Sequence, residues 1–464
     1  MKLYKKIFLA LFICLLCVQS SFAINDKKEK NKKENEIQST SAEYNNEVHS
    51  VFSLKDCINI AVEHNPSIRS SIYSEQIYQS KIGQAWSNFF PKISGGLDLS
   101  RTMNHYSGDV SYQNSSYTLG YVPTISAGMM LFDFGKTKAL ADYAKRTFES
   151  KKASTKENIN DIVYNIKSAY FNILFAQAQV KVYEDTVKDY ELQLSQAEAF
   201  YKIGKKAKID VVTAEYNLGK AKLNLVTAKN VLQVANVQLS KIMGIPEYTN
   251  YELSDELILN EYDETFENLI KTAYDVRPEL VSAWKTAEAA KMNLRAKKRN
   301  YTPDLEIYGS YGNGLGDVYN VSSGQFGVQL NYSQLNMMRV KKEIAEAKAT
   351  YNKYLADYDD TKDTVYLNVK KNYLDLQTAR ESIIIAKLAL DEAAEQYRQV
   401  TGRYKAGVGD AIELKDGENT YLNARLDFYN AMLDYNVTAA SLEKEVGAPI
   451  VFSDKLILDM KKEE

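Results

Sequence analysis

The stretch Tyr201-Lys202-Ile203-Gly204 recurs further along the chain as Tyr404-Lys405-Ala406-Gly407. Residues that follow the two stretches repeat in the same order, as Ile209 and Ile412, Glu215 and Glu418, Ala221 and Ala424, and Leu223 and Leu426. Six of the seven prolines also pair, as Pro66 with Pro278, Pro91 with Pro303, and Pro246 with Pro449. This ordered series indicates an internal tandem duplication of ~200 residues, a period far longer than that of solenoid repeats.

Each copy contains a long stretch that lacks both glycine and proline, at residues 136–203 and 339–401. Apolar residues recur there at helical spacing, and in the first copy they include Ile159, Ile162, Val163, Ile166, Tyr170 and Ile173. Because a helix rises ~1.5 Å per residue, each helix would be ~95–100 Å long. A second helix would return after each glycine turn. The sequence therefore predicts one long helical hairpin per copy.

Ahead of each long helix, apolar and polar residues alternate with the period of two that is typical of strands. The alternation covers residues 116–132, 305–311 and 326–332. We expect two strands per copy, joined by polar, glycine-containing loops at 104–116 and 312–324. A single lead-in helix is expected before the strands, at 53–88 in the first copy and at 265–299 in the second.

The first 23 residues are typical of a signal peptide, with lysines at the start, an apolar core and Ser21-Phe22-Ala23 as cleavage site. A membrane anchor is the alternative, but the twelve-residue core would reach only ~18 Å of a ~30 Å bilayer. The predicted segments are a signal peptide (1–23), a flexible charged leader (24–50), the first repeat (51–246), a linker (247–264), the second repeat (265–449) and a C-terminal tail (450–464).

Composition and motifs argue against a chemical function. The formal net charge of −2 leaves no global electrostatic footprint for nucleic acid. There is no Gly-x-Ser-x-Gly sequence, no phosphate-binding Gly-Lys-Ser/Thr and no paired histidine motif. Cys57 is the only cysteine beyond the signal peptide, and the three histidines are scattered. We therefore expect no enzyme, no catalytic residues, no cofactor and no metal site.

Four half-apolar strands pose a structural problem. If they span a membrane, they cannot close a barrel alone, because open sheet edges are untenable in lipid and small barrels start at ~8 strands. Three chains would supply twelve. Tyrosines near the strand ends fit an interfacial belt, and they are Tyr106, Tyr112, Tyr117, Tyr308, Tyr311 and Tyr319. The alternative is a soluble sheet packed on the helices.

Over residues 51–449 the sequence resembles a known family, the TolC-like outer membrane efflux channels. The motifs that carry the resemblance are Asn65-Pro66 in the lead-in helix, Leu131-Phe132-Asp133-Phe134-Gly135 after the strands, and the Gly-x-Pro close of each copy. The Tyr-x-x-Gly turns, followed by Asp210-Val211 and Glu413-Leu414, also match. One departure is Leu335-Asn336-Met337-Met338-Arg339, where the family usually has an Asp-Gly turn.

The resemblance implies a mixed α/β membrane protein. A homotrimer would form a 12-stranded β-barrel in the outer membrane, four strands per chain, continued into the periplasm by a long α-helical coiled-coil barrel. Such a channel is the passive exit duct of a tripartite efflux or type I secretion system for drugs, small molecules or polypeptides. Its partners are outer-membrane lipid, a periplasmic adaptor (membrane fusion) protein and an inner-membrane pump.

A periplasmic coiled-coil adaptor or structural protein without a pore is the alternative function. Adaptors of that kind usually have one helical hairpin and glycine-rich lipoyl-like segments. The present sequence has two hairpins with strands at matched places, which favours the channel.

Two acidic residues are candidates for the periplasmic entrance of such a channel. Glu413 and Asp416 lie three residues apart at the start of a returning helix and therefore share a face. The resemblance places them in an acidic ring of six carboxylates per trimer. Favourable interaction with the helix dipole is the alternative explanation for acids in a first turn.

By the same resemblance, Asp210 and Tyr404 correspond to residues that hold the entrance shut. The alternatives are helix capping for Asp210 and packing for Tyr404. The family's usual basic partner falls on Gly409, and the hydroxyl neighbour of Asp210 is replaced by Ile209. Five basic residues nearby could substitute for the missing partner, namely Lys205, Lys206, Lys208, Arg403 and Lys405.

Overall fold

A computed structural model describes most of the chain. The described residues are 50–104, 116–245, 251–254, 260–262, 264–316, 320–332, 337–449 and 452–456. The expected signal peptide, the leader up to residue 49 and most of the expected tail lie outside these ranges, as do Tyr106, Tyr112 and Tyr319.

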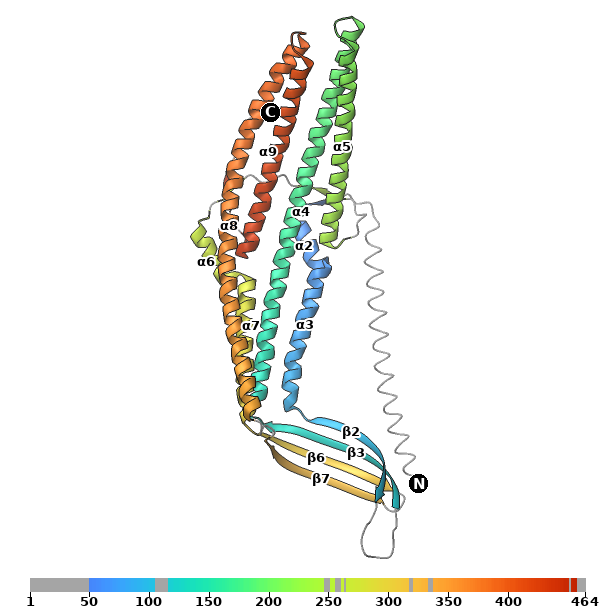
Figure 1. The fold of residues 1–464 in the computed structure, drawn as a ribbon, viewed down its shortest axis with the longest axis vertical. Coiled ribbons are helices and arrows are strands. Elements are labelled where there is room, and N and C mark those ends of the chain that lie inside the picture. The colour runs from blue at the N-terminus through green and yellow to red at the C-terminus, as the bar shows by residue number, and fades with distance from the viewer. Residues whose placement is uncertain are drawn as a thin grey trace, which may run out of the picture.

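Two long helical hairpins dominate the structure and run side by side away from a small sheet (Figure 1). The first hairpin consists of α4 (Lys136–Lys202) and α5 (Lys208–Met243), and the second of α8 (Met337–Lys405) and α9 (Ala411–Val446). Helices α4 and α8 have 67 and 69 residues, so each is ~100 Å long. Gly204 and Gly407, with φ of 70° and 79°, provide the left-handed residues that end them. The predicted hairpins are confirmed.

The expectation of one lead-in helix per copy is wrong. The first copy has α2 (Leu54–His64) and α3 (Pro66–Trp86), and the second has α6 (Phe266–Val276) and α7 (Pro278–Lys298). The break falls on the residue before each proline, which the proline ring pushes out of the helical region. Asn65 and Arg277 accordingly have ψ of 123° and 121°.

In the first copy, the break between α2 and α3 receives the end of α5. The Asn65 amide donates to the Ile242 carbonyl at 2.6 Å, and its oxygen accepts from the Ser67 backbone at 2.7 Å. Gly244 follows α5 with φ of 75°, and a Cβ there would lie 2.7 Å from the His64 carbonyl oxygen. The Asn-Pro and Gly-x-Pro motifs are therefore two sides of one junction, where only glycine fits.

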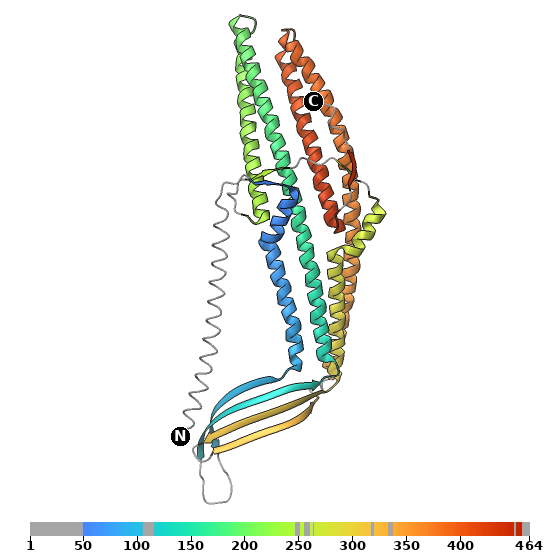
Figure 2. The same ribbon diagram turned by 180° about the vertical axis from the view of Figure 1, so that it is seen from behind.

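The second copy builds the same junction with different chemistry. Arg277 donates to the Glu445 carbonyl at 2.8 Å and forms an ion pair with Glu279 at 2.9 Å. A Cβ on Gly447 would lie 3.2 Å from the Arg277 Cα. In both copies two shorter helices thus follow one another along a single long helix, α3 and α5 along α4, and α7 and α9 along α8 (Figures 1 and 2).

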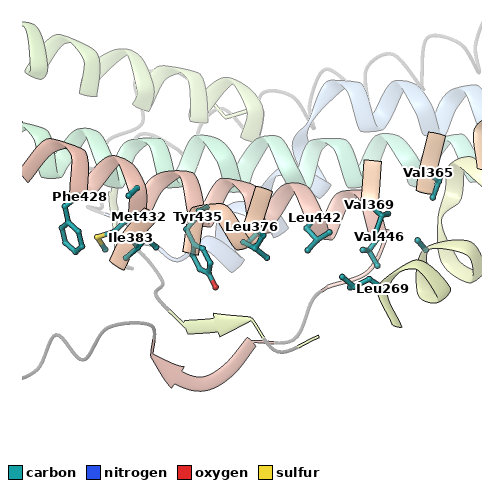
Figure 3. Packing of buried hydrophobic residues seen from close by; sticks show 14 of the residues in the cluster. Leu269, Val365, Val369, Leu376, Ile383, Phe428, Met432, Tyr435, Leu442 and Val446 are labelled. Carbon is teal, nitrogen blue, oxygen red and sulfur yellow. The ribbon is translucent and has the colours of Figure 1, made fainter. Parts of the chain in front are cut away.

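Two short strand pairs lie about half-way along the long helices (Figures 1 and 2). β1 (Ser50–Phe52) pairs in parallel with β4 (Tyr251–Leu253), and β5 (Asn260–Tyr262) pairs antiparallel with β8 (Phe452–Leu456). The larger core cluster lies at this level, where side chains of α6, α8 and α9 interdigitate (Figure 3). Its labelled members are Leu269, Val365, Val369, Leu376, Ile383, Phe428, Met432, Tyr435, Leu442 and Val446. A second cluster contains Cys57, which is fully buried.

The four predicted strands form one antiparallel sheet in the order β2-β3-β6-β7. The strands are β2 (Lys92–Asn104), β3 (Ser116–Phe132), β6 (Asp304–Gly316) and β7 (Asn320–Asn331). The loop expected at 312–324 is wrong, because β6 continues to Gly316 and β7 begins at Asn320. Gly312 and Ser323 pair within the ladder. Backbone hydrogen bonds between strands need no apolar side chain. The polar, glycine-rich residues of this segment therefore form strand although they lack the apolar alternation that predicts one.

Candidate functional site

One face of the sheet is apolar and exposed. Residues directly opposite one another in an antiparallel ladder project to the same face, and the apolar pairs run across all four strands. They are Ile93 with Ala127, Leu97 with Pro123, Ile125 with Tyr311, Met129 with Ile307, Ile307 with Val328, and Leu305 with Leu330. The Ile93 and Phe326 side chains are 77% and 78% exposed. Such a large apolar surface marks a membrane or partner contact.

The opposite face of the sheet is polar. Ser94 and Ser126 hydroxyls lie 2.7 Å apart, and the Gln329 amide donates to the Glu306 carboxylate at 3.1 Å. The sheet extends from the end of the helices and does not lie against them (Figures 1 and 2). The alternative of a soluble sheet packed on the helices is therefore wrong. An apolar outer face and a polar inner face are typical of a transmembrane barrel wall.

At the other end of the molecule, the turn between α8 and α9 holds the two predicted acidic residues. Asp410 precedes α9 and accepts from the Ile412 backbone at 3.3 Å. Arg403, in the last turn of α8, donates to Glu413 at 2.6 Å. Asp416 is exposed. Within one chain, the charge of Glu413 is therefore offset by Arg403, whereas Asp416 faces solvent.

The residues expected to close the entrance lie on both hairpin turns. The Asp210 carboxylate accepts from the Ala207 backbone at 3.1 Å, which is a capping contact at the start of α5. Tyr404 is 5% exposed and packs on Val400 and Leu414. The Lys206 ammonium of the first turn lies 3.9 Å from the centre of the Tyr404 ring. Among the five basic residues that the sequence left open, Lys206 thus reaches Tyr404.

The structure also explains why no basic side chain occupies position 409. A Cβ on Gly409 would lie 2.7 Å from the Tyr404 backbone nitrogen and 3.0 Å from the Arg403 carbonyl carbon. The turn is therefore closed too tightly on α8 for any side chain at this place. Lys206 approaches Tyr404 from the neighbouring hairpin instead.

A buried polar cluster between the hairpins was not predicted from the sequence. Glu418 of α9 is 4% exposed, and the Gln193 amide of α4 donates to it at 3.0 Å. Burial raises the pKa of Glu418 to about 7. Beside it, Tyr397 of α8 donates to Asp189 of α4 at 3.5 Å. The sequence pointed to Glu418 only through its repeat partner Glu215. The spacing of the two residues could not predict that Glu418 is buried and Glu215 exposed.

Two further observations concern the described part of the chain. None of its helices is both long and apolar enough to cross a membrane. Within the same residues, no group of three or more histidine, cysteine, aspartate or glutamate side chains could hold a metal ion.

A known protein family matches each of the two copies separately. The profile of the family described as outer membrane efflux protein matches residues 57–245 and again residues 269–448. The chain belongs to this family. Its function is that of an outer-membrane efflux channel and not of an enzyme, and the alternative of a pore-free periplasmic adaptor is wrong.

Curated relatives and solved structures agree with this assignment. The chain is 20% identical over 401 residues to the probable efflux pump outer membrane protein TtgC of Pseudomonas putida, covering 85% of this chain and 82% of that protein. It is 23% identical over 405 residues to the outer membrane protein TolC of Escherichia coli, with coverage of 82% and 80%. The structure of the Campylobacter jejuni CmeC outer membrane channel superposes with a TM-score of 0.75 at 16% identity, covering 87% of each chain.

The two faces of the sheet give a test of the efflux protein's membrane placement. Val328 lies on the apolar face and is 58% exposed, whereas the next residue, Gln329, projects to the polar face. Val328→Lys should sharply reduce the protein recovered from the outer membrane in heat-modifiable form, because lysine on a lipid face costs ~2–4 kcal/mol at mid-bilayer. Gln329→Lys is the matched control and should assemble normally. Equal recovery of both variants would contradict a lipid-facing role for this surface.

Proposed function

We propose that three copies of this chain form one channel, the outer-membrane duct of a tripartite efflux or type I secretion system. The observation that carries the proposal is a four-stranded sheet with an exposed apolar face and two open edges, mounted on helices ~100 Å long. Among the strands that the structure describes, β2 and β7 each pair on one side only. In lipid, their free backbone groups need a partner. Joining β7 of one copy to β2 of the next satisfies them, and three copies give twelve strands.

The channel itself is passive in this proposal. Energy comes from an inner-membrane pump, and a periplasmic adaptor joins the pump to the hairpin turns. The Pseudomonas putida relative is named as an efflux pump component, which supports the same arrangement for this chain. The cargo class is drugs, other small molecules or polypeptides.

The duplication also suggests how neighbouring subunits meet. Within one chain, Gln193 of α4 donates to Glu418 of α9 across the two hairpins. Both residues have counterparts 203 positions away in the other repeat, Gln396 on α8 and Glu215 on α5, and both counterparts are exposed. A closed ring would bring α5 of one subunit against α8 of the next. Gln396 and Glu215 would then repeat the contact between subunits.

A cysteine pair tests this ring. In a Cys57→Ser background, Glu215→Cys combined with Gln396→Cys should cross-link on oxidation and give three covalently joined chains on a denaturing gel. Glu215→Cys combined with Glu381→Cys is the control, because Glu381 is exposed on α8 but lies ~22 Å further along the helix. A ladder that ends at a dimer or continues to a tetramer would contradict the trimer.

For the entrance, we propose that Glu413 and Asp416 line the periplasmic opening as a ring of acidic side chains. Both lie in the first turns of α9, beside the tip of the hairpin. Three copies would bring six carboxylates and three Arg403 side chains together, so the ring keeps a net negative charge. Such a ring attracts cations.

The double variant Glu413→Ala/Asp416→Ala should lose cation preference and show weaker block by divalent cations in planar bilayers. Trimer assembly should stay near normal, since acids in a first helical turn contribute only ~0.3–1 kcal/mol each. Asp427→Ala removes an exposed acid further along α9 and serves as control. If the double variant keeps its selectivity and its block, the two acids serve only the start of the helix.

Closure of the entrance is the third part of the proposal. We assign it to Asp210 and Tyr404, with Lys206 in place of the family's usual basic partner. Support comes from the position of Lys206, which stands over the Tyr404 ring from the other hairpin. The Asp210 cap fixes the start of α5 next to this turn.

Lys206→Ala should therefore raise the resting conductance in planar bilayers about 2- to 5-fold, the equivalent of a cation–π contact of ~0.5–1 kcal/mol. Tyr404→Phe keeps the ring and should have a smaller effect. Lys205→Ala removes the exposed lysine next to it and is the control. A resting conductance that responds equally to Lys205→Ala and Lys206→Ala would exclude a specific contact.

A further inference from the structure

The carboxyl group of Glu418 is buried where the two hairpins meet. Glu418 lies on α9 and is 4% exposed, and its Oε2 atom accepts from Gln193 of α4 at 3.0 Å. Its Oε1 atom is buried and has no hydrogen-bond partner among the described residues. The preceding residue, Gly417, holds α9 tightly against α8, because a Cβ there would lie 2.7 Å from Val400. Glu418 is therefore kept from water while α9 packs against both α8 and α4.

The groups around Glu418 come from three helices. α4 contributes Asp185, Asp189 and Tyr190, and the nearby Tyr190 hydroxyl acts to lower the pKa of Glu418. α8 contributes Tyr397, which donates to Asp189 at 3.5 Å, and Lys405 acts on Asp189 from further along the helix.

The remaining group comes from α9 itself and does not neutralise Glu418. Arg425 forms an ion pair with Asp185 of α4 at 3.2 Å. No cation in the described part of the chain forms an ion pair with Glu418. The nearest charged neighbour that acts on it is Asp189, and a second carboxylate disfavours ionisation.

We propose that Glu418, with Gln193 and Tyr190, is a proton-sensitive latch between the two hairpins. The protonated carboxyl holds α9 against α4, and the ionised carboxylate loosens that contact. The latch deepens the proposed function, because separation of the hairpins is the movement that would widen the periplasmic entrance.

The direction of the pH effect depends on which state, packed or separated, binds the Glu418 proton more tightly. With the hairpins packed, burial raises the pKa of Glu418 to about 7. With the hairpins apart, water restores the ordinary glutamate pKa of ~4.3. Between these two values the packed state binds one more proton, so lowering the pH in this window favours packing and raising it favours separation. Above pH 7 both states have lost the proton and the dependence ends.

The test measures the distance between the two hairpin turns. Ile203 and Val408 are 65% and 74% exposed, one on each turn, and both can carry a spin label as cysteines in a Cys57→Ser background. Full-length chain carrying both labels is co-expressed with excess unlabelled chain, so that one subunit per channel reports. Double electron–electron resonance should show the separated population growing up to tenfold per pH unit between about pH 5 and 7, then levelling off.

Three variants make the test specific. Glu418→Gln is neutral and isosteric, so the distance distribution should stay narrow and lose its pH dependence. Tyr190→Phe removes a donor that favours the ionised carboxylate, and the transition should shift to higher pH. Asp427→Asn changes an exposed acid on the same helix and should behave like the unsubstituted protein.

An unchanged pH profile in Glu418→Gln would assign the response to other groups, such as Asp189, and overturn the proposal. A flat profile in the unsubstituted protein would overturn it as well. The readout is independent of transport. If the distances respond as expected but the channel carries no current in bilayers, the latch stands and the proposed duct fails.

Discussion

Backbone hydrogen bonding at the edges of a four-stranded sheet constrains the whole molecule. Within the described part of the chain, β2 and β7 each have one unpaired edge, and the side chains of the sheet present an apolar face that water does not solvate well. A sheet of this kind is stable in lipid only if its edges are closed. Four strands are too few to curl onto themselves, so closure requires further copies. The demand for assembly is therefore already present in the fold of one chain.

The two copies of the duplicated unit build their helices with the same backbone geometry but with different side chains at one junction. In both copies a left-handed glycine ends one helix against a proline-initiated helix, so that two short helices follow one long helix. The carbonyls at this end need donors. The first copy supplies the Asn65 amide as the donor, and the second supplies the Arg277 guanidinium, which also forms an ion pair with the Glu445 carboxylate. The two copies thus share the backbone shape of the junction, whereas the side chain that donates to its carbonyls differs.

Much of this architecture could be predicted from the sequence, and the failures have physical causes. Long glycine-free periodic stretches leave helix as the only choice, and the paired prolines reveal the duplication. The strand segment around Gly312 was missed because its hydrogen bonds do not depend on apolar side chains. The helix breaks before Pro66 and Pro278 were missed because the pattern continues through them. The partner of Tyr404 could not be chosen, because five basic residues are close in sequence and only packing separates Lys206 from the rest.

The distribution of contacts at the hairpin ends bears on how an entrance could move. Within each hairpin the buried contacts are apolar, as between Tyr190 and Ala221 in the first and between Tyr404 and Leu414 in the second, and ion pairs such as Arg403 with Glu413 lie outside them. Across the hairpins they are polar, with Gln193 on Glu418 and Arg425 on Asp185. Apolar packing is lost steeply when surfaces separate, whereas water can replace a polar partner at small net cost. At these ends we therefore expect the contact between the hairpins to open more readily than the contacts within one hairpin.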